Sequence, residues 1–100
     1  MTAEVRLAAA LRKFTGGAIS LPGQGETVSQ VLDNLEERCP GLKSQLITGG
    51  NRPHPFINIY LNDQDIRFLR ELETPVVNGD VITILPAMAG GRLATSKGRG

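Results

Sequence analysis

Cysteine and histidine are almost missing from this chain of 100 residues, which holds one of each, Cys39 and His54. A single cysteine cannot form an internal disulfide, and one cysteine with one histidine cannot assemble a Cys/His zinc site. Long apolar runs are missing too. None approaches the ~18 residues of a membrane span, and Glu4 and Arg6 interrupt the N-terminal stretch that a signal peptide keeps apolar. These absences argue against metal and redox chemistry and against a membrane partner, and they favour a cytoplasmic protein.

A basic surface is also missing from most of the chain. The formal net charge is +1, but three of the eleven basic residues, Arg92, Lys97 and Arg99, lie beyond residue 91. Residues 1–91 therefore carry eight basic and ten acidic residues. A surface that binds nucleic acid needs clustered lysine and arginine on the folded domain. We therefore expect no nucleic-acid partner.

The first half of the chain predicts a β-hairpin followed by one helix. Apolar residues alternate over residues 5–12, as in a strand with one buried face, and residues 18–21 predict the returning strand. Residues 22–25, which contain a proline and two glycines, are expected to interrupt the regular secondary structure. Thr27 then predicts a helix N-cap, with Gln30 completing a capping box. The apolar residues that follow at helical spacing are Val28, Val31, Leu32, Leu35 and Cys39.

The second half predicts three more strands, at residues 56–61, 66–68 and 81–85, with an Asn78-Gly79 turn before the last of them. A hairpin, one helix and three further strands indicate an α+β fold. In this fold a mixed sheet of four to five strands carries the main helix on one face. The first and last strands are expected side by side in the middle of the sheet.

Only one face of such a sheet is covered by the helix. The period of two along the strands directs Ile57, Ile59, Leu61, Ile82 and Ile84 inward and Phe56, Asn58, Tyr60, Thr83 and Leu85 outward. If Phe56, Tyr60 and Leu85 form one apolar patch, they are candidate partner-binding residues, and Met88 could add to it. The alternative is that they are scattered surface residues without a role.

The residues that follow the last predicted strand form an unusual sequence. After Pro86 come Ala87, Met88 and Ala89, and then a glycine pair, Gly90-Gly91. Glycine has no Cβ, so this pair is the narrowest thread that a polypeptide can form and suits insertion into a tight channel of a partner. We expect a folded domain over residues 1–86, a flexible arm over 87–91 and a disordered C-terminal extension over 92–100. The alternative is that the glycines merely link the domain to its tail.

Three stretches together resemble one protein family. They are the closing residues 78–91, the Phe56-Ile57-Asn58-Ile59-Tyr60-Leu61-Asn62 strand, and Thr27-Val28 at the start of the helix. These residues resemble the ubiquitin-like sulfur carriers, which have a β-grasp fold and include ThiS, MoaD and the CysO-type carriers of cysteine biosynthesis. The resemblance covers residues 5–91, and residues 58–68 are most similar to the CysO-type branch.

The resemblance implies a chemistry at the backbone of Gly91, with Gly90 giving steric access. An E1-like enzyme uses ATP to adenylate the carboxylate of Gly91, a sulfur donor displaces AMP, and the resulting thiocarboxylate gives its sulfur to a synthase. The carrier is then a co-substrate and not an enzyme, with no stably bound cofactor. ATP belongs to the activating enzyme.

One departure from the family pattern lies after the diglycine, where nine residues follow Gly91. The carbonyl of Gly91 is then part of a peptide bond to Arg92 and offers no free carboxylate. By resemblance to extended carriers, we expect a zinc-dependent JAMM-type peptidase to cut between Gly91 and Arg92. A vestigial diglycine is the competing interpretation.

Three other functions stay open at this point. A ubiquitin-like modifier would join Gly91 to lysines through the same activation, and a carrier could serve molybdopterin or thiamine synthesis instead of cysteine synthesis. A non-reactive interaction module would use only the uncovered face of the sheet.

Overall fold

The chain folds into one mixed five-stranded sheet covered by helices on one side. A computed structural model describes residues 1–49 and 52–86. Its strand order is β2-β1-β5-β3-β4, and the central pair β1 and β5 is parallel whereas the other neighbours are antiparallel. The strands are β1 (Thr2–Leu7), β2 (Ser20–Gln24), β3 (Ile57–Leu61), β4 (Gln64–Asp65) and β5 (Val81–Pro86).

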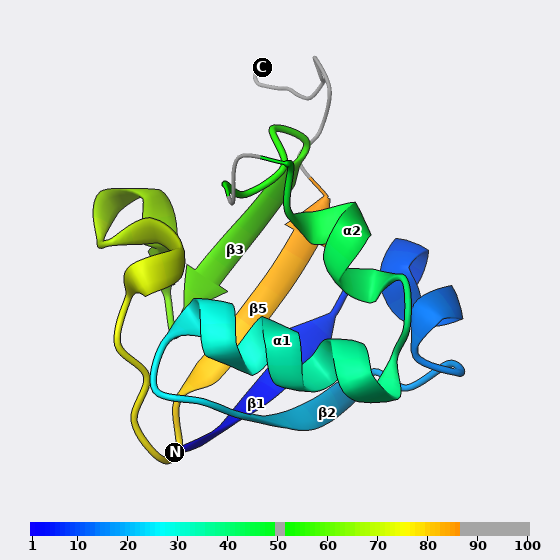
Figure 1. The fold of residues 1–100 in the computed structure, drawn as a ribbon, viewed down its shortest axis with the longest axis horizontal. Helices are drawn as coiled ribbons and strands as arrows, with labels where there is room; N and C mark the ends of the chain where they lie inside the picture. The colour runs from blue at the N-terminus through cyan, green and yellow to red at the C-terminus, as the bar shows by residue number, and fades with distance from the viewer. Residues whose placement is uncertain (50–51, 87–100) are drawn as a thin grey trace.

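Two α-helices and three 3₁₀ helices complete the fold. They are α1 (Val28–Arg38), α2 (Leu42–Leu46), η1 (Ala9–Phe14), η2 (Ile66–Phe68) and η3 (Glu71–Glu73). The helix α1 crosses the sheet, and α2 continues on the same side (Figure 1). No helix in the described part of the chain has both the length and the apolar character needed to cross a membrane. The α+β, β-grasp fold expected from the sequence is confirmed, with β1 and β5 adjacent in the middle.

The start of α1 follows the expected capping chemistry. The hydroxyl of Thr27 accepts a hydrogen bond from the backbone N–H of Gln30 at 3.2 Å. The side-chain oxygen of Gln30 reaches back to the backbone N–H of Glu26 at 2.8 Å, one residue earlier than in the standard capping box. The first bond satisfies a backbone donor that the first turn of a helix leaves free, and the second fixes the residue before the N-cap. The helix therefore begins where the local sequence predicts it.

The core lies between α1 and the covered face of the sheet. The five apolar residues at helical spacing, from Val28 to Cys39, are all buried, and so are the inward residues of β1, β3 and β5. Leu42 and Leu46 of α2 and Ile66, Leu72 and Val76 extend the same cluster. The inward and outward positions predicted from the period of two are confirmed for the residues of β3 and β5, but Phe56, which was expected on the outward face of the strand, lies before the start of β3.

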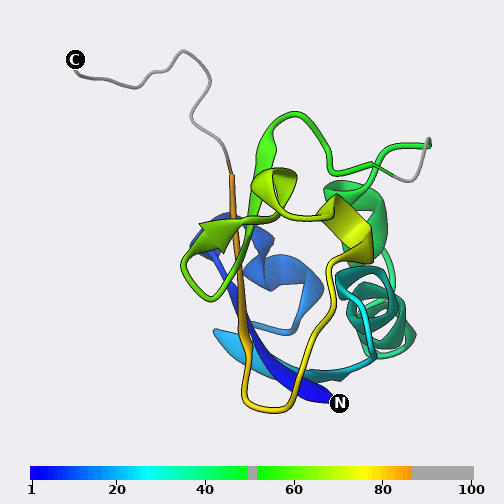
Figure 2. The same cartoon turned by 90° about the vertical axis from the view of Figure 1, so that its left-hand side faces the viewer.

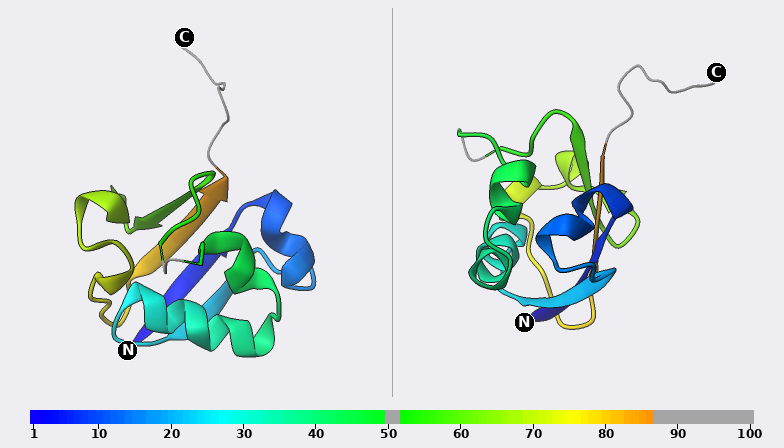
Figure 3. Two further views of the ribbon diagram at one scale, coloured as in Figure 1. Left: turned by 45° about the horizontal axis from the view of Figure 1, so that its top comes forward. Right: turned by 90° about the vertical axis from the view of Figure 1, so that its right-hand side faces the viewer.

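Seen along the sheet, both α-helices lie on one side of β5 and none lies on the other (Figures 2 and 3). This open face is formed by the outward residues of the three central strands. They are Thr2, Glu4 and Arg6 of β1, Val81, Thr83 and Leu85 of β5, and Asn58 and Tyr60 of β3. The open face thus has polar residues along β1 and apolar side chains at Tyr60 of β3 and at Val81 and Leu85 of β5.

Three sequence-based expectations were wrong. Residues 5–12 are not one strand, because β1 ends at Leu7 and η1 follows, with the N–H of Leu11 bonded to the carbonyl of Ala8 at 2.9 Å. Alanine has a low β-strand propensity, so the alternating pattern at residues 8–10 was not supported by the residue types that form it. Residues 22–24 do not interrupt the regular secondary structure, because they belong to β2. This strand lies at the edge of the sheet, where a proline is tolerated.

The expected strand at 66–68 is instead the 3₁₀ helix η2, which follows a β4 of only two residues. The carboxylate of Asp65 accepts the backbone N–H of Arg67 at 2.9 Å and so caps this turn. An aspartate that bonds to the backbone two residues later favours a turn over a strand. The β-branched Ile66 is buried in the core from this turn.

Gly25 provides a test of the close approach between β2 and α1. A Cβ at this position would lie 2.6 Å from the backbone nitrogen of Val31 and 2.8 Å from the carbonyl carbon of Gln30. Neither backbone atom can move without displacing the helix. Gly25→Ala should therefore lower the free energy of unfolding by about 1–3 kcal/mol, as overpacking generally does. Chemical denaturation measures it, with Gly49→Ala as a control because no described atom lies within 4 Å of that Cβ. Equal stabilities of the two variants would contradict the packing.

Candidate functional site

The candidate site begins where β5 ends. This strand is held on both sides, by β1 through residue 84 and by β3 through the pair Ile57 and Pro86. The N–H of Ala8 donates to the carbonyl of Ile84 at 3.1 Å, and the side chain of Ile84 is fully buried. The fold therefore fixes the root of the C-terminal segment firmly against the sheet. Met88, Gly90, Gly91 and Arg92, four of the predicted site residues, lie outside the described residues.

The other three predicted site residues are placed by the structure. Tyr60 and Leu85 lie on the open face of adjacent strands, where Tyr60 is opposite Thr83 and Leu85 is opposite Asn58. Side chains in such a diagonal relation are within reach of one another on a sheet face. Leu85 is 40% exposed and Tyr60 is half-buried. The structure therefore places these two on one surface beside the end of β5.

Phe56 has a different setting. It precedes β3, is 59% exposed, and its ring lies against His54 with the ring centres 5.6 Å apart. The backbone N–H of Phe56 donates to Nδ1 of His54 at 3.1 Å, so the turn before β3 holds both residues. His54 has a structural partner that the sequence did not reveal. Phe56 thus belongs to this turn rather than to the strand surface of Tyr60 and Leu85.

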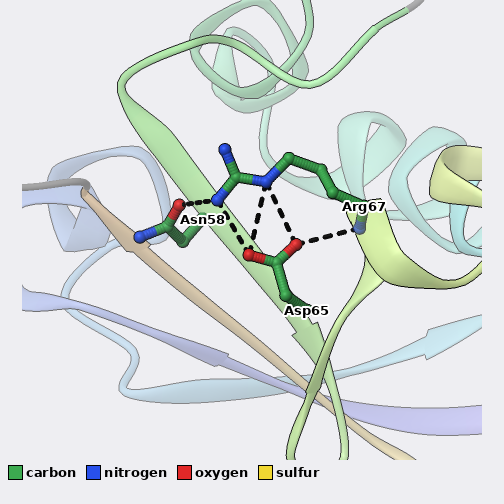
Figure 4. Close-up of polar contacts among 3 residues, drawn as sticks. All are labelled: Asn58, Asp65 and Arg67. Atoms are coloured by element: carbon green, nitrogen blue, oxygen red, sulfur yellow. Dashed lines mark hydrogen bonds and ion pairs between the residues drawn. The ribbon is translucent and has the colours of Figure 1, made fainter.

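A polar cluster crosses the open face at β3, formed by Asn58, Asp65 and Arg67 (Figure 4). The guanidinium Nε of Arg67 lies 3.1 Å and 3.3 Å from the two carboxylate oxygens of Asp65, and Nη2 lies 2.8 Å from Oδ2. Nη2 also donates to Oδ1 of Asn58. A guanidinium fork on a carboxylate is the strong form of this ion pair. Arg67 is therefore fixed across β3 rather than free in solvent.

The electrostatics of the pair follow from this geometry. The side-chain hydrogen bond from Arg67 lowers the pKa of Asp65 below its ordinary value of 3.8, and the same bond raises the pKa of Arg67. Because the pKa of the folded carboxyl is lowered, its contribution to stability is present above the ordinary value and is lost as the pH falls through the lowered pKa. The cluster is thus intact throughout the neutral range.

Sequence reasoning missed this cluster and its neighbour Phe68. Phe68 is 86% exposed at the end of η2, beside a hollow of about 400 Å³. Tyr60, Asp63, Gln64, Asp65, Phe68 and Leu69 line the hollow. The available signal was an aspartate and an arginine two residues apart after a turn. It could not reveal the contact with Asn58, nine residues earlier, because that contact depends on how β4 folds back along β3.

Comparisons with known proteins agree with the fold and extend the description. Residues 5–91 match the model of the ThiS family. The chain is 40% identical over 93 residues to the sulfur carrier protein CysO of Mycobacterium tuberculosis, covering 91% of this chain and all of that protein. The CysO-type carrier resemblance is thereby confirmed.

Two solved structures are also similar. One is the BexX/CysO complex of Amycolatopsis orientalis, with a TM-score of 0.84, 44% identity, and coverage of 89% of this chain and 99% of that chain. The other is small archaeal modifier protein 1 of Methanosarcina acetivorans, with a TM-score of 0.77, 36% identity, and coverage of 90% and 96%.

Proposed function

This chain belongs to the ThiS family, and from that premise we propose that it is a cytoplasmic sulfur carrier whose carrying group is the carboxylate of Gly91. The main support is the extent of the match, because the family model runs to residue 91, the second glycine of the pair. The curated relative that is matched over its whole length is named a sulfur carrier. The protein then acts as a co-substrate for other enzymes and not as an enzyme.

The proposed chemistry takes place on the backbone. An E1-like enzyme joins the carboxylate of Gly91 to AMP and releases pyrophosphate from ATP. A sulfur donor then attacks the acyl carbon, AMP leaves, and a thiocarboxylate remains. Its sulfur is anionic at neutral pH and, like a thiolate, nucleophilic without a neighbouring base. A synthase takes up this sulfur, and we propose cysteine synthesis as its destination because of the similarity to CysO.

The described fold suits such a role. The sheet holds β5 as far as Pro86, so a segment that starts there has a rigid base. Residues 87–91 can span about 17 Å when fully extended. That length carries Gly91 into a buried site while the domain stays outside. The domain thereby supplies recognition and the arm supplies the reacting group.

Residues 92–100 must be removed before this chemistry, since the carbonyl of Gly91 is otherwise in a peptide bond to Arg92. We propose that a zinc-dependent JAMM-type peptidase makes this cut. Mass spectrometry of the protein from its native cell tests the step. A product that ends at Gly91 is expected, and exclusively full-length protein would contradict it.

A second candidate is a ubiquitin-like modifier that is joined through Gly91 to lysines. The similarity to a protein named as an archaeal modifier favours it, at 36% identity over 90% of this chain. Both functions use the same activation of Gly91, so they differ only in the fate of the activated group. Peptides in which Gly91 is bonded to a lysine side chain in cell extracts would favour the modifier.

The deciding experiment uses a chain that ends at Gly91. This chain is incubated with ATP, the E1-like enzyme of the native host and sulfide, and its mass is followed. The expected product has gained the mass difference of one oxygen replaced by sulfur, in a reaction that requires ATP. A chain that ends at Ala89 is the control and should not react. No mass change in the complete mixture would reject the sulfur-carrier proposal.

A further inference from the structure

Recognition of this chain by an activating enzyme poses a chemical problem, if the proposed function holds. Gly90 and Gly91 have no side chains, so the end of the arm offers few features by which an enzyme could distinguish this protein from others. A synthase that receives the carrier can recognise the thiocarboxylate sulfur. The activating enzyme meets only a free carboxylate, which every protein has at its C-terminus. The folded domain must therefore supply most of the contacts by which the activating enzyme selects this protein over others.

The cluster at β3 has the chemistry for this task. The guanidinium of Arg67 has five N–H groups, and those on Nε and Nη2 are used by Asp65 and Asn58. Its Nη1 has no acceptor among residues 1–49 and 52–86, and Figure 4 shows this nitrogen directed away from both partners. Arg67 therefore keeps donors available on the outer side of the cluster.

Asn58 contributes donors as well. Its Oδ1 accepts from Arg67, so the amide orientation is fixed and Nδ2 is on the other side. Nδ2 of Asn58 has no acceptor in the described part of the chain. The two free nitrogens, Nη1 of Arg67 and Nδ2 of Asn58, thus lie on either side of the bond between the two side chains and point away from it. A cationic donor such as Nη1 suits a carboxylate, and an amide donor such as Nδ2 suits a further oxygen acceptor.

The donors are held rigidly. The side chain of Asp65 is 11% exposed, and it binds both the backbone N–H and the guanidinium of Arg67. Because the side chain of Arg67 is already ordered in the free protein, it loses less conformational entropy when a partner binds there. Arginine and tyrosine are also the residue types that most often dominate the binding energy of protein interfaces. Tyr60 lies on the same strand face, opposite Thr83.

The location links the cluster to the arm. Asn58 is the register partner of Leu85, which precedes the last described residue, Pro86. An enzyme that encloses residues 87–91 must contact the domain at the root of this segment. The donors of Asn58 and Arg67 and the exposed side chain of Leu85 are the groups that it meets there. The cluster is therefore continuous with the surface from which the arm leaves.

We propose that Arg67 and Asn58 are recognition residues for the activating enzyme, which presents an aspartate or glutamate side chain to Nη1 of Arg67 and a second oxygen acceptor to Nδ2 of Asn58. Leu85 and Tyr60 lie beside this contact and pack against apolar side chains of the same enzyme. Asp65 acts as a positioning residue that holds the guanidinium. This inference rests on the proposed function, since it requires that Gly91 is activated.

The test measures activation of the chain that ends at Gly91 by the E1-like enzyme of the native host, followed as exchange of pyrophosphate into ATP. Arg67→Ala should raise the KM for the chain about tenfold or more, as for a well-placed interface arginine, and leave kcat within about twofold because the reacting carboxylate is unchanged. Arg70→Ala is the matched control. Arg70 is also exposed, and its side chain makes no hydrogen bond among the described residues.

A second variant guards against a folding defect. Arg67→Ala removes the partner of a largely covered carboxylate, whereas Asn58→Ala leaves the ion pair of Asp65 and Arg67 in place. Asn58→Ala should raise KM by about threefold or more, as the loss of a neutral hydrogen bond does, and should remain folded, because only an exposed hydrogen bond is removed from the free protein. If Arg67→Ala is unfolded, the result for Asn58→Ala decides.

The outcomes separate this inference from the proposed function. If the unaltered chain is activated and neither variant changes KM relative to Arg70→Ala, the recognition site is refuted while the sulfur-carrier proposal stands. The same holds if KM for activation is unchanged and only sulfur transfer to the synthase is impaired. If the unaltered chain is not activated, the proposed function fails and this inference fails with it.

Discussion

Replacing Gly91 by valine in the chain that ends at residue 91 is expected to slow ATP-dependent activation by at least about a hundredfold, the effect of a misplacement of about 1 Å at a reacting centre. The reason is steric. In the proposed reaction, a branched side chain on the residue that carries the carboxylate would widen the segment that enters the adenylation site and turn the carboxylate away from the α-phosphate of ATP. Pyrophosphate exchange at saturating ATP measures the rate.

Stability should not change in this variant, because residue 91 lies five positions after the last residue of β5. Ala89→Val in the same arm is the matched control, since it adds a comparable bulk two residues before the carboxylate and should cost much less. The melting temperatures of both variants should equal that of the unaltered chain. Activation of Gly91→Val at the normal rate would show that the second glycine is not the reacting residue.

Much of the fold could be predicted because its signals are local or strictly periodic. The N-cap at Thr27 and the apolar residues of α1 lie within twelve residues of one another, and each agrees with the others. The period of two along β3 and β5 determines which side chains face the core, whatever the neighbouring strand. The adjacency of the first and last strands follows from the order of the elements and the rules for their connection.

The errors occurred where side chains compete with the backbone pattern. Residues 8–10 are alanines, which fit an alternating sequence pattern but have little apolar surface to hold a strand in register. At β4, the carboxylate of Asp65 bonds to the backbone of Arg67 and converts the expected strand into η2. Such a bond can be suspected from an aspartate after a turn, but its strength relative to strand pairing cannot be read from the sequence.

The candidate site divides in the same way. The glycine pair stands out in the sequence by its order after an apolar strand and a proline, but it lies outside the described residues, so its role stays a prediction. The outward positions of Tyr60 and Leu85 could be predicted from strand parity. The cluster of Asn58, Asp65 and Arg67 could not, since it requires the fold-back of β4 and the rotamer of a long side chain.

The second large effect concerns the two faces of the sheet, which a matched pair of leucine substitutions separates. Leu35 of α1 is fully buried, whereas Leu85 of β5 is 40% exposed on the open face. Leu35→Ala should lower the free energy of unfolding by about 2–5 kcal/mol, the usual cost of a cavity in a core. Leu85→Ala should change it by no more than about 0.5 kcal/mol, as at a surface position. Urea denaturation of both variants measures these values.

The same pair should behave in the opposite way in activation. At a temperature where Leu35→Ala is still folded, its KM for the activating enzyme should be normal, because Leu35 lies on the covered face. Leu85→Ala should raise KM, since the proposed contact with the enzyme includes this side chain. A loss of stability in Leu85→Ala as large as in Leu35→Ala would mean that Leu85 belongs to the core. A normal KM for Leu85→Ala would mean that the enzyme does not use this side chain of the open face.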